Sequence, residues 1–119
     1  MDKNNPIAAF SKAFALRTIK LYKFLSEEKR EYVMSKQVLR SGISIGANIR
    51  ESIYAQSRAD FVSKMSIALK ESSETEYWLE LLHESGYIDD NAFESIYDDN
   101  CKLSATLINI IKKTKESDK

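Results

Sequence analysis

The chain has 119 residues, of which 43% are hydrophobic and 30% are charged, and it contains only 3 glycines and 1 proline. This composition is typical of one globular domain, here residues 1–119, and excludes a disordered chain, a collagen-like repeat and a loop-rich scaffold. The single cysteine excludes a disulfide framework within the chain, and the single histidine excludes a histidine-rich metal site. We therefore expect no cofactor and no metal.

Membrane and secretion signals are missing from the sequence. No apolar run approaches the roughly 18 residues that a membrane span requires. Residues 1–6 do not show the charged and then apolar layout of a secretory signal. We expect a soluble, cytoplasmic protein without a membrane partner.

The formal net charge is zero, but the two signs are separated along the chain. Residues 1–70 carry 13 basic and 6 acidic side chains, whereas residues 71–111 carry 10 acidic side chains and a single basic one. A uniformly basic nucleic-acid binder is therefore not indicated. A chain with this asymmetry can attract its own copy head to tail or offer one basic side to an anionic partner. The simpler interpretation is that the charges lie on solvated helix faces without further consequence.

Large side chains recur at three- and four-residue spacing over residues 6–25, which predicts a first amphipathic helix. Pro6 suits its first turn, where a missing N–H group leaves no hydrogen bond unmade. Residues 26–30 are all polar and predict the first connection, although they contain no Gly or Pro and could continue the helix. The predicted buried stripe is Ile7, Phe10, Phe14, Arg17, Leu21 and Phe24.

A second helix is predicted over residues 31–54. Gly42 and Gly46 lie in this helix, where each glycine costs about 1 kcal/mol relative to alanine. Close approach of another backbone would compensate for this cost, and that backbone could belong to the same bundle or to a second copy. The predicted buried stripe is Val38, Gly42, Ile45, Ile49 and Ile53.

The third and fourth helices, over residues 58–85 and 90–114, have clear end signals. Ser57 with Asp60 three residues later resembles a capping box, Gly86 suits a left-handed residue after a helix, and Asp89 suits an N-cap. Four amphipathic helices with short connections predict an all-α, up-down-up-down antiparallel four-helix bundle. The predicted stripes are Phe61, Met65, Ala68, Ser72, Thr75, Leu79 and Leu82, and then Phe93, Ile96, Asn100, Leu103, Leu107 and Ile110.

A polar stripe lies beside the apolar stripe of the second helix, and the third helix offers acidic side chains that could meet it. We expect a partly buried hydrogen-bonded network with Asn48 and Glu71 as its principal members, which would fix register and partner at some cost in stability. The alternative is that these side chains are solvated. The candidate network is Gln37, Ser41, Ser44, Asn48, Glu51, Glu71 and Glu74.

Two sequence runs in the second and third predicted helices form a pair of motifs. The first run covers residues 35–51 (SKQVLRSGISIGANIRE), and the second starts at Asp60 and Phe61 and continues through residues 67–71 (IALKE) and 74–82 (ETEYWLELL). Together, these runs resemble the signatures of a bacterial family of four-helix bundle proteins. That family is named for members encoded within intervening sequences of 23S ribosomal RNA.

The resemblance implies a homo-oligomeric helical ring, of five subunits, with no known enzymatic activity. The family is also similar in fold to the accessory variability protein of diversity-generating retroelements, a pentameric barrel that binds a reverse transcriptase and nucleic acid. That relative is strongly basic, whereas this chain is neutral. The resemblance implies no catalytic role for the motif residues.

Catalytic chemistry has two possible starting points in the sequence, and each lacks a necessary part. Glu80 and His83 have the Glu-x-x-His spacing of di-iron carboxylate bundles, but such sites need two of these motifs and the chain has one histidine. Cys101 has no neighbour at helical spacing that would activate a thiolate. We expect no catalytic residue and no metal ligand.

The third predicted helix has more apolar surface than one core can bury. With its core stripe facing inward, Ile67, Trp78 and Leu81 fall on another side, and an exposed stripe containing tryptophan is typical of an interface. A two-fold dimer pairs a flank with itself, whereas a head-to-tail contact pairs the basic flank with the acidic one. We expect a closed ring of identical subunits that is joined through these three residues.

The sequence therefore predicts a non-enzymatic, homo-oligomeric scaffold or adaptor whose main partner is its own copy and whose other partner could be a second protein. The alternative is an accessory factor that binds RNA or DNA through the basic side of the first two helices. The basic residues of that alternative are Lys12, Lys20, Lys23, Arg30, Lys36, Arg40, Arg50 and Arg58.

Overall fold

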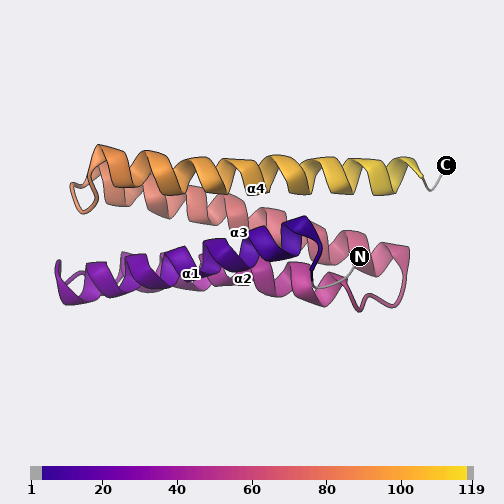
Figure 1. The fold of residues 1–119 in the computed structure, drawn as a ribbon, viewed down its shortest axis with the longest axis horizontal. Coiled ribbons are helices and arrows are strands. Elements are labelled where there is room, and N and C mark those ends of the chain that lie inside the picture. Colours follow the sequence, from indigo (N-terminus) through magenta and orange to yellow (C-terminus); the bar gives the residue numbers. More distant parts are fainter. Residues whose placement is uncertain (1–3, 118–119) are drawn as a thin grey trace.

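A computed structural model describes residues 4–117 of the chain. Four helices follow one another: α1 (Pro6–Glu27), α2 (Met34–Ser52), α3 (Arg58–Glu84) and α4 (Asp90–Glu116). Each helix runs antiparallel to the previous one, so the chain forms an elongated bundle of 49 × 21 × 20 Å (Figure 1). The predicted all-α, up-down-up-down bundle is confirmed, and the described part of the chain contains no strand. Within this part, no helix combines the length and apolarity needed to cross a membrane.

The predicted end signals of α3 and α4 take the expected form. The Ser57 side chain accepts a hydrogen bond from the Asp60 amide at 3.0 Å, and that of Asp89 accepts one from the Ala92 amide at 2.8 Å. Gly86 has a φ of 85°, the left-handed conformation that a glycine adopts without strain after a helix. Ile88 follows it and is buried, which folds the α3–α4 connection against the core.

The start of α2 differs from the prediction by three residues. Glu31 is not helical. Its carboxylate accepts hydrogen bonds from the amides of Val33, Met34 and Ser35 at 3.3, 3.1 and 2.8 Å, and the residue is buried. A carboxylate in this position satisfies amides that the first turn cannot pair and interacts favourably with the positive end of the helix. Helix α1 therefore ends at Glu27, and Glu31 lies before α2 and accepts hydrogen bonds from its first amides, rather than being its first residue.

The other predicted boundaries differ by one or two residues. Helices α1 and α4 end two residues later than predicted, at Glu27 and Glu116. Helices α2 and α3 end two residues and one residue earlier than predicted, at Ser52 and Glu84. Helix ends commonly vary by this amount, because terminal turns lack part of their hydrogen bonding. Residues 1–3 and 118–119 of the predicted domain lie outside the described residues.

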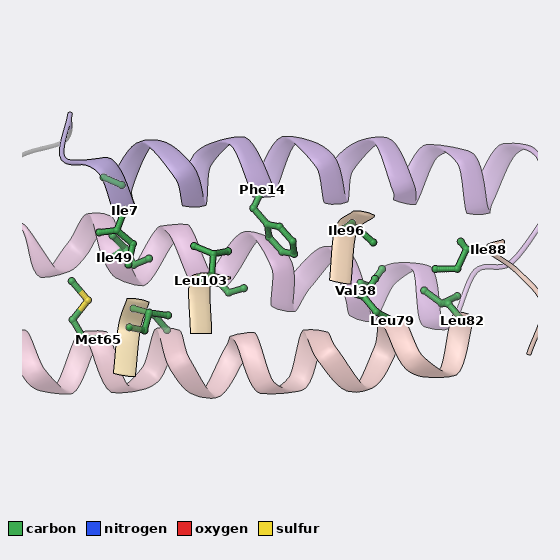
Figure 2. Packing of buried hydrophobic residues seen from close by; sticks show 14 of the residues in the cluster. Ile7, Phe14, Val38, Ile49, Met65, Leu79, Leu82, Ile88, Ile96 and Leu103 are labelled. Carbon is green, nitrogen blue, oxygen red and sulfur yellow. The ribbon is translucent and has the colours of Figure 1, made fainter. Parts of the chain in front are cut away.

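The core lies along the axis of the bundle and receives large apolar side chains from all four helices (Figure 2). The predicted stripes of α2, α3 and α4 lie on the core side, with their terminal members only partly buried. In the stripe predicted for α1, Ile7 and Phe14 are buried as expected, but the other buried positions are different residues. Phe10, Arg17 and Leu21 are half-buried and Phe24 is exposed. The buried face of α1 is Ile7, Ala8, Ser11, Phe14, Thr18 and Leu25.

The small polar residues on this face explain the difference. A Cβ atom added at Gly42 would overlap the Thr18 side chain, and one added at Gly46 would lie 3.4 Å from the Ser11 carbonyl oxygen. Ser11 and Thr18 donate their hydroxyl groups to the carbonyls of Ala8 and Ala15 in their own helix, so they can be buried without cost. The two α2 glycines therefore serve the close approach of α1 within the bundle.

Candidate interaction surfaces

Arg40 connects α2 to α3 on the surface of the bundle. Its Nη1 donates to Oε2 of Glu71 at 3.2 Å, its Nη2 forms an ion pair with Glu74, and its Nε donates to Oε1 of Gln37 at 3.4 Å. About half of the Arg40 side chain is exposed to solvent. Exposed pairs of this kind contribute at most about 1 kcal/mol each to stability, so their main effect is to orient these side chains.

The polar network predicted around Asn48 and Glu71 is arranged differently. The Asn48 amide donates to the carbonyl of Ser44 at 2.8 Å within α2, and the Ser44 hydroxyl donates to the carbonyl of Arg40 at 2.7 Å. The side-chain partner that Glu71 finds on α2 is Arg40. A short polar side chain in a helix readily bonds the carbonyl four residues earlier, whereas the longer arginine reaches the neighbouring helix. Glu51 lies 4.0 Å from the ammonium group of Lys64.

A buried polar layer crosses the core and joins α2, α3 and α4. The hydroxyl groups of Ser41 and Thr75 are hydrogen-bonded at 2.8 Å. One turn away on α3, Ser72 Oγ lies 2.9 Å from Asn100 Oδ1, and Asn100 Nδ2 donates to the Ser72 carbonyl at 3.0 Å. All four residues are buried, and no buried side-chain nitrogen or oxygen among residues 4–117 lacks a partner. Only Ser41 was predicted as part of a network.

The signal for this layer was present in the core stripes. Ser72, Thr75 and Asn100 occupy positions at which the helical period predicts burial, and a buried side chain of this kind needs a partner. The sequence alone does not say which neighbouring helix supplies that partner. The packing of α3 between α2 and α4 determines the partners, because Thr75 faces α2 and Ser72 faces α4.

One exposed apolar surface runs along α3, and we call it the α3 ridge: Ile67, Tyr77, Trp78 and Leu81. Ile67 is 40% exposed and Tyr77 is 55% exposed, whereas Trp78 and Leu81 are half-buried. Trp78 donates from Nε1 to Glu74 at 3.0 Å and meets the Tyr77 ring edge-on, with centroids 5.4 Å apart. The three residues predicted to form an interface lie on one flank of α3, and Tyr77, which was not among them, is exposed beside Trp78.

A second apolar surface covers the outer side of α1 and α2, and we call it the α1–α2 band: Leu16, Leu39, Ile43 and Ala47. Leu16 is 56% exposed and Ile43 is 38% exposed. A shallow groove between α1 and α2 includes Ile43 and Ala47 of this band and is otherwise lined mainly by small residues, together with Lys12 and Arg50. These two basic residues are among those predicted from the sequence, but the band is not, because its members come from two different helices.

Arg17 spans the outer side of the α1–α4 contact, which is the smallest of the four contacts between neighbouring helices. Its guanidinium group lies 2.7 Å from Oδ2 of Asp99 and donates to the carbonyl and hydroxyl oxygens of Ser95 at 3.2 and 2.9 Å. A groove of about 540 Å³ lies beside it. Lys20 and Asp89 line this groove together with apolar residues, namely Leu21, Phe24, Ile88, Ala92 and Ile96.

Acidic side chains gather where α3 faces the first half of α4. The Tyr97 hydroxyl lies 2.7 Å from Glu76 Oε1 and 3.0 Å from Glu80 Oε2. The hydrogen bond to Glu76, followed by burial and the bond to Glu80, raises the pKa of Tyr97. The pKa of the Cys101 thiol is also raised, mainly by burial and further by the nearby carboxylates, of which Glu76 has the largest effect.

His83 and Glu80 do not converge on a common site. The His83 Nε2 atom lies 2.7 Å from Asp90 Oδ1, and the ring stacks on Phe93 with centroids 4.1 Å apart. Glu80 instead contacts Tyr97. Among residues 4–117, no group of three or more His, Cys, Asp or Glu side chains is placed to hold a metal ion.

The sequence model of the 23S rRNA-intervening sequence protein family matches residues 3–109 of the chain. The chain belongs to this family. A crystal structure of a protein of unknown function from the S23 ribosomal protein family of Bacteroides thetaiotaomicron is similar, with a TM-score of 0.88 and 57% sequence identity. That alignment covers 89% of this chain and 98% of the other. A search of curated proteins finds no match.

In this member of the 23S rRNA-intervening sequence protein family, both sequence motifs meet at the α2–α3 contact. Residues 35–51 make up most of α2, and residues 60–82 lie within α3. The first motif supplies the glycines that contact α1 and the Arg40 side chain that reaches α3. The motifs therefore specify how α2 is packed on both sides, which is a structural role.

The structure divides the eight predicted basic residues among several surfaces. Arg40 is engaged with Glu71 and Glu74, and Arg58 contacts Ser117 at the far end of the bundle. Lys20 lines the α1–α4 groove, and Arg30 lies in the α1–α2 connection. The remaining four are exposed and project from the side that carries the α1–α2 band: Lys12, Lys23, Lys36 and Arg50.

Proposed function

We propose that this protein is a non-enzymatic scaffold that assembles with copies of itself into a closed ring of five subunits. The observation that carries the proposal is the pair of exposed apolar surfaces on different sides of the bundle, the α3 ridge and the α1–α2 band. Exposed apolar surface with aromatic residues is typical of protein interfaces. Because the two surfaces differ, contact between them is head to tail, and such contacts form rings when the rotation closes.

Light scattering coupled to size-exclusion chromatography tests the assembly. We expect one species with the mass of five chains, about 68 kDa from the 13.6 kDa of one chain. Its mass should not depend on loading concentration over about a hundredfold range, because a closed ring has no free ends to which further copies can add. A mass of one or two chains at all concentrations would contradict the proposal, and a continuous increase in mass would indicate a filament.

A second candidate function is binding of RNA or DNA through the α1–α2 side. It is favoured by Lys12, Lys23, Lys36 and Arg50, which share that side and pair with no acidic side chain among residues 4–117. Phosphate contacts release counterions, so affinity must fall steeply as salt rises. Fluorescence anisotropy with a labelled single-stranded RNA 20-mer at 50 and 200 mM salt tests this function. Absence of binding at the lower salt concentration would exclude it.

A further inference from the structure

We infer that the α3 ridge of one copy packs into the α1–α2 band of the next copy. This inference rests on the proposed self-assembly and adds to it the two surfaces that make the contact. Each surface exposes two large apolar side chains, Ile67 and Tyr77 on the ridge and Leu16 and Ile43 on the band. Each therefore has apolar area that contact with a second copy would remove from water.

The shapes of the two surfaces differ in the way that such a contact needs. The band follows a shallow groove in which Ala15, Gly46 and Ala47 leave little side-chain volume. The ridge carries large aromatic side chains, because Tyr77 and Trp78 are adjacent and in edge-to-face contact. Tyr77 is exposed and Trp78 is half-buried beside it, and aromatic side chains of this kind are enriched at the centres of interfaces.

The two surfaces also lie at the same height along the bundle. Within one copy, Ser41 is hydrogen-bonded to Thr75, and Glu51 lies beside Lys64, so these pairs define which residues of α2 and α3 are level. Counting from them places Ile67 level with residues 48–49 and Tyr77 level with Leu39. Two copies that stand side by side in the same orientation can therefore bring the part of the ridge from Ile67 to Tyr77 against the band, over a length of about 15 Å.

Charge favours this pairing over contact between two identical surfaces. The band is flanked by Lys12, Lys36 and Arg50, so a two-fold contact through it would oppose basic side chains. The ridge is flanked by side chains of both signs: Glu74, which is paired with Arg40, the exposed Lys70, and Glu84, which is exposed within about one turn of the level of Lys36. Unlike charges then face each other at the end of the contact.

The positions of the two surfaces favour closure. The band lies on one side of α2, and the ridge lies on the flank of α3 that faces α2. Two surfaces that share a helix between them are inclined toward one another, so successive copies turn around a common axis. Surfaces on opposite sides of the bundle would instead extend into a filament.

Cysteine cross-linking in the full chain tests the contact. Ala47→Cys and Ile67→Cys, combined with Cys101→Ser, place one thiol on each surface. We expect mild oxidation to give disulfide-linked products up to the full ring on a non-reducing gel. Either cysteine alone should give no ladder. A matched control combines Ile67→Cys with Ala105→Cys, an exposed position on α4, and should also remain unlinked.

Substitution of the apolar residues gives a second measurement. Ile43→Asp and Tyr77→Asp should each raise the dissociation constant of the assembly at least about a hundredfold, because each buries a charge in the contact. Ile108→Asp is the control, since Ile108 is 52% exposed on α4 outside both surfaces. An intact ring that neither cross-links nor responds to these variants would overturn this inference and leave the scaffold proposal standing. A monomeric wild-type protein would contradict both.

Discussion

The pair α1–α2 and the pair α3–α4 keep their helices at the correct distance by different physical means. Between α1 and α2 the contact depends on shape, because Gly42 leaves just enough space for Thr18. Between α3 and α4 it depends on buried hydrogen bonds, because Ser72 and Asn100 satisfy one another. The first contact tolerates little added volume, and the second tolerates no loss of a partner. Substitutions should therefore destabilise the two pairs for different physical reasons.

Asn100→Leu should have the largest effect on stability. It removes the buried partner of Ser72, whose hydroxyl then lies in the core without its hydrogen bond, and it introduces a branched side chain into a packed position. We expect a loss of about 3 kcal/mol in the free energy of unfolding. Urea denaturation followed by circular dichroism measures it.

The double variant Asn100→Leu with Ser72→Ala separates the two causes. Removing both polar partners should restore part of the loss, because no unsatisfied hydroxyl remains. The double variant could instead lose more free energy of unfolding than the two single variants lose together. In that case the hydrogen bonds would not be the reason that α3 and α4 stay in register.

Gly42→Val should have the next largest effect and tests the other half of the comparison. The added atoms overlap Thr18, which is buried and cannot move away freely. We expect a loss of about 2 kcal/mol, as is usual for overpacking. Gly46→Ala is the matched control, because its Cβ would meet only an ordinary close contact, and helix propensity should make it neutral or slightly stabilising.

Thr18→Ala combined with Gly42→Val should recover a large part of the stability, since it removes the atoms that clash. Both variants are measured by thermal and urea unfolding. Equal losses for Gly42→Val and Gly46→Ala would show that a helical glycine as such, rather than the space at Thr18, decides the α1–α2 contact.

Glu76→Gln should change the reactivity of Cys101 without a large change in stability. Burial, and next to it the carboxylate of Glu76, raises the pKa of the thiol, so at pH 8 less thiolate is present than in an unperturbed cysteine. Neutralising Glu76 should lower this pKa and so increase the rate of alkylation by iodoacetamide, because a larger fraction of the thiol is then ionised. Glu94→Gln is the control. A rate unchanged by Glu76→Gln would contradict this electrostatic explanation.

Asn48→Leu should have the smallest effect. Since the Asn48 amide bonds a carbonyl of its own helix and does not join α2 to α3, its loss leaves no buried group of α3 without a partner. We expect the free energy of unfolding to change by less than about 0.5 kcal/mol. A loss above about 2 kcal/mol in urea denaturation would restore the role predicted for Asn48 as a link between helices.

Most of the fold could be predicted because the helical period and the end signals are local properties. The stripes of α2, α3 and α4 consist mainly of residues whose apolarity marks burial directly, and Ser57, Gly86 and Asp89 act through hydrogen bonds or φ values within a few residues. The stripe of α1 was predicted only in part, with Ile7 and Phe14 correct, because Ser11 and Thr18 are polar by type. Their burial depends on the glycines of another helix.

The candidate surfaces could be predicted only in part. The excess apolar residues of α3 were visible in its sequence period, but Tyr77 was missed, and so was the α1–α2 band. A residue outside a core stripe can be exposed to solvent or can contact a partner, and the helical period does not distinguish the two. The sequence of one helix also does not show which residues of the neighbouring helix lie beside it. Glu31 gave no signal as a cap, because its role depends on where α1 stops.

The sequence by itself determined the number of helices, their order, most of their inward faces and the separation of charge along the chain. These follow from residue spacing and from chemistry that acts over one or two helical turns. Only the tertiary structure decided that Arg40 rather than Asn48 reaches Glu71, that Thr75 and Ser72 find partners on different helices, and that Gly42 is matched to Thr18. These contacts depend on the distance and rotation between helices, which are set by the packing of all four together.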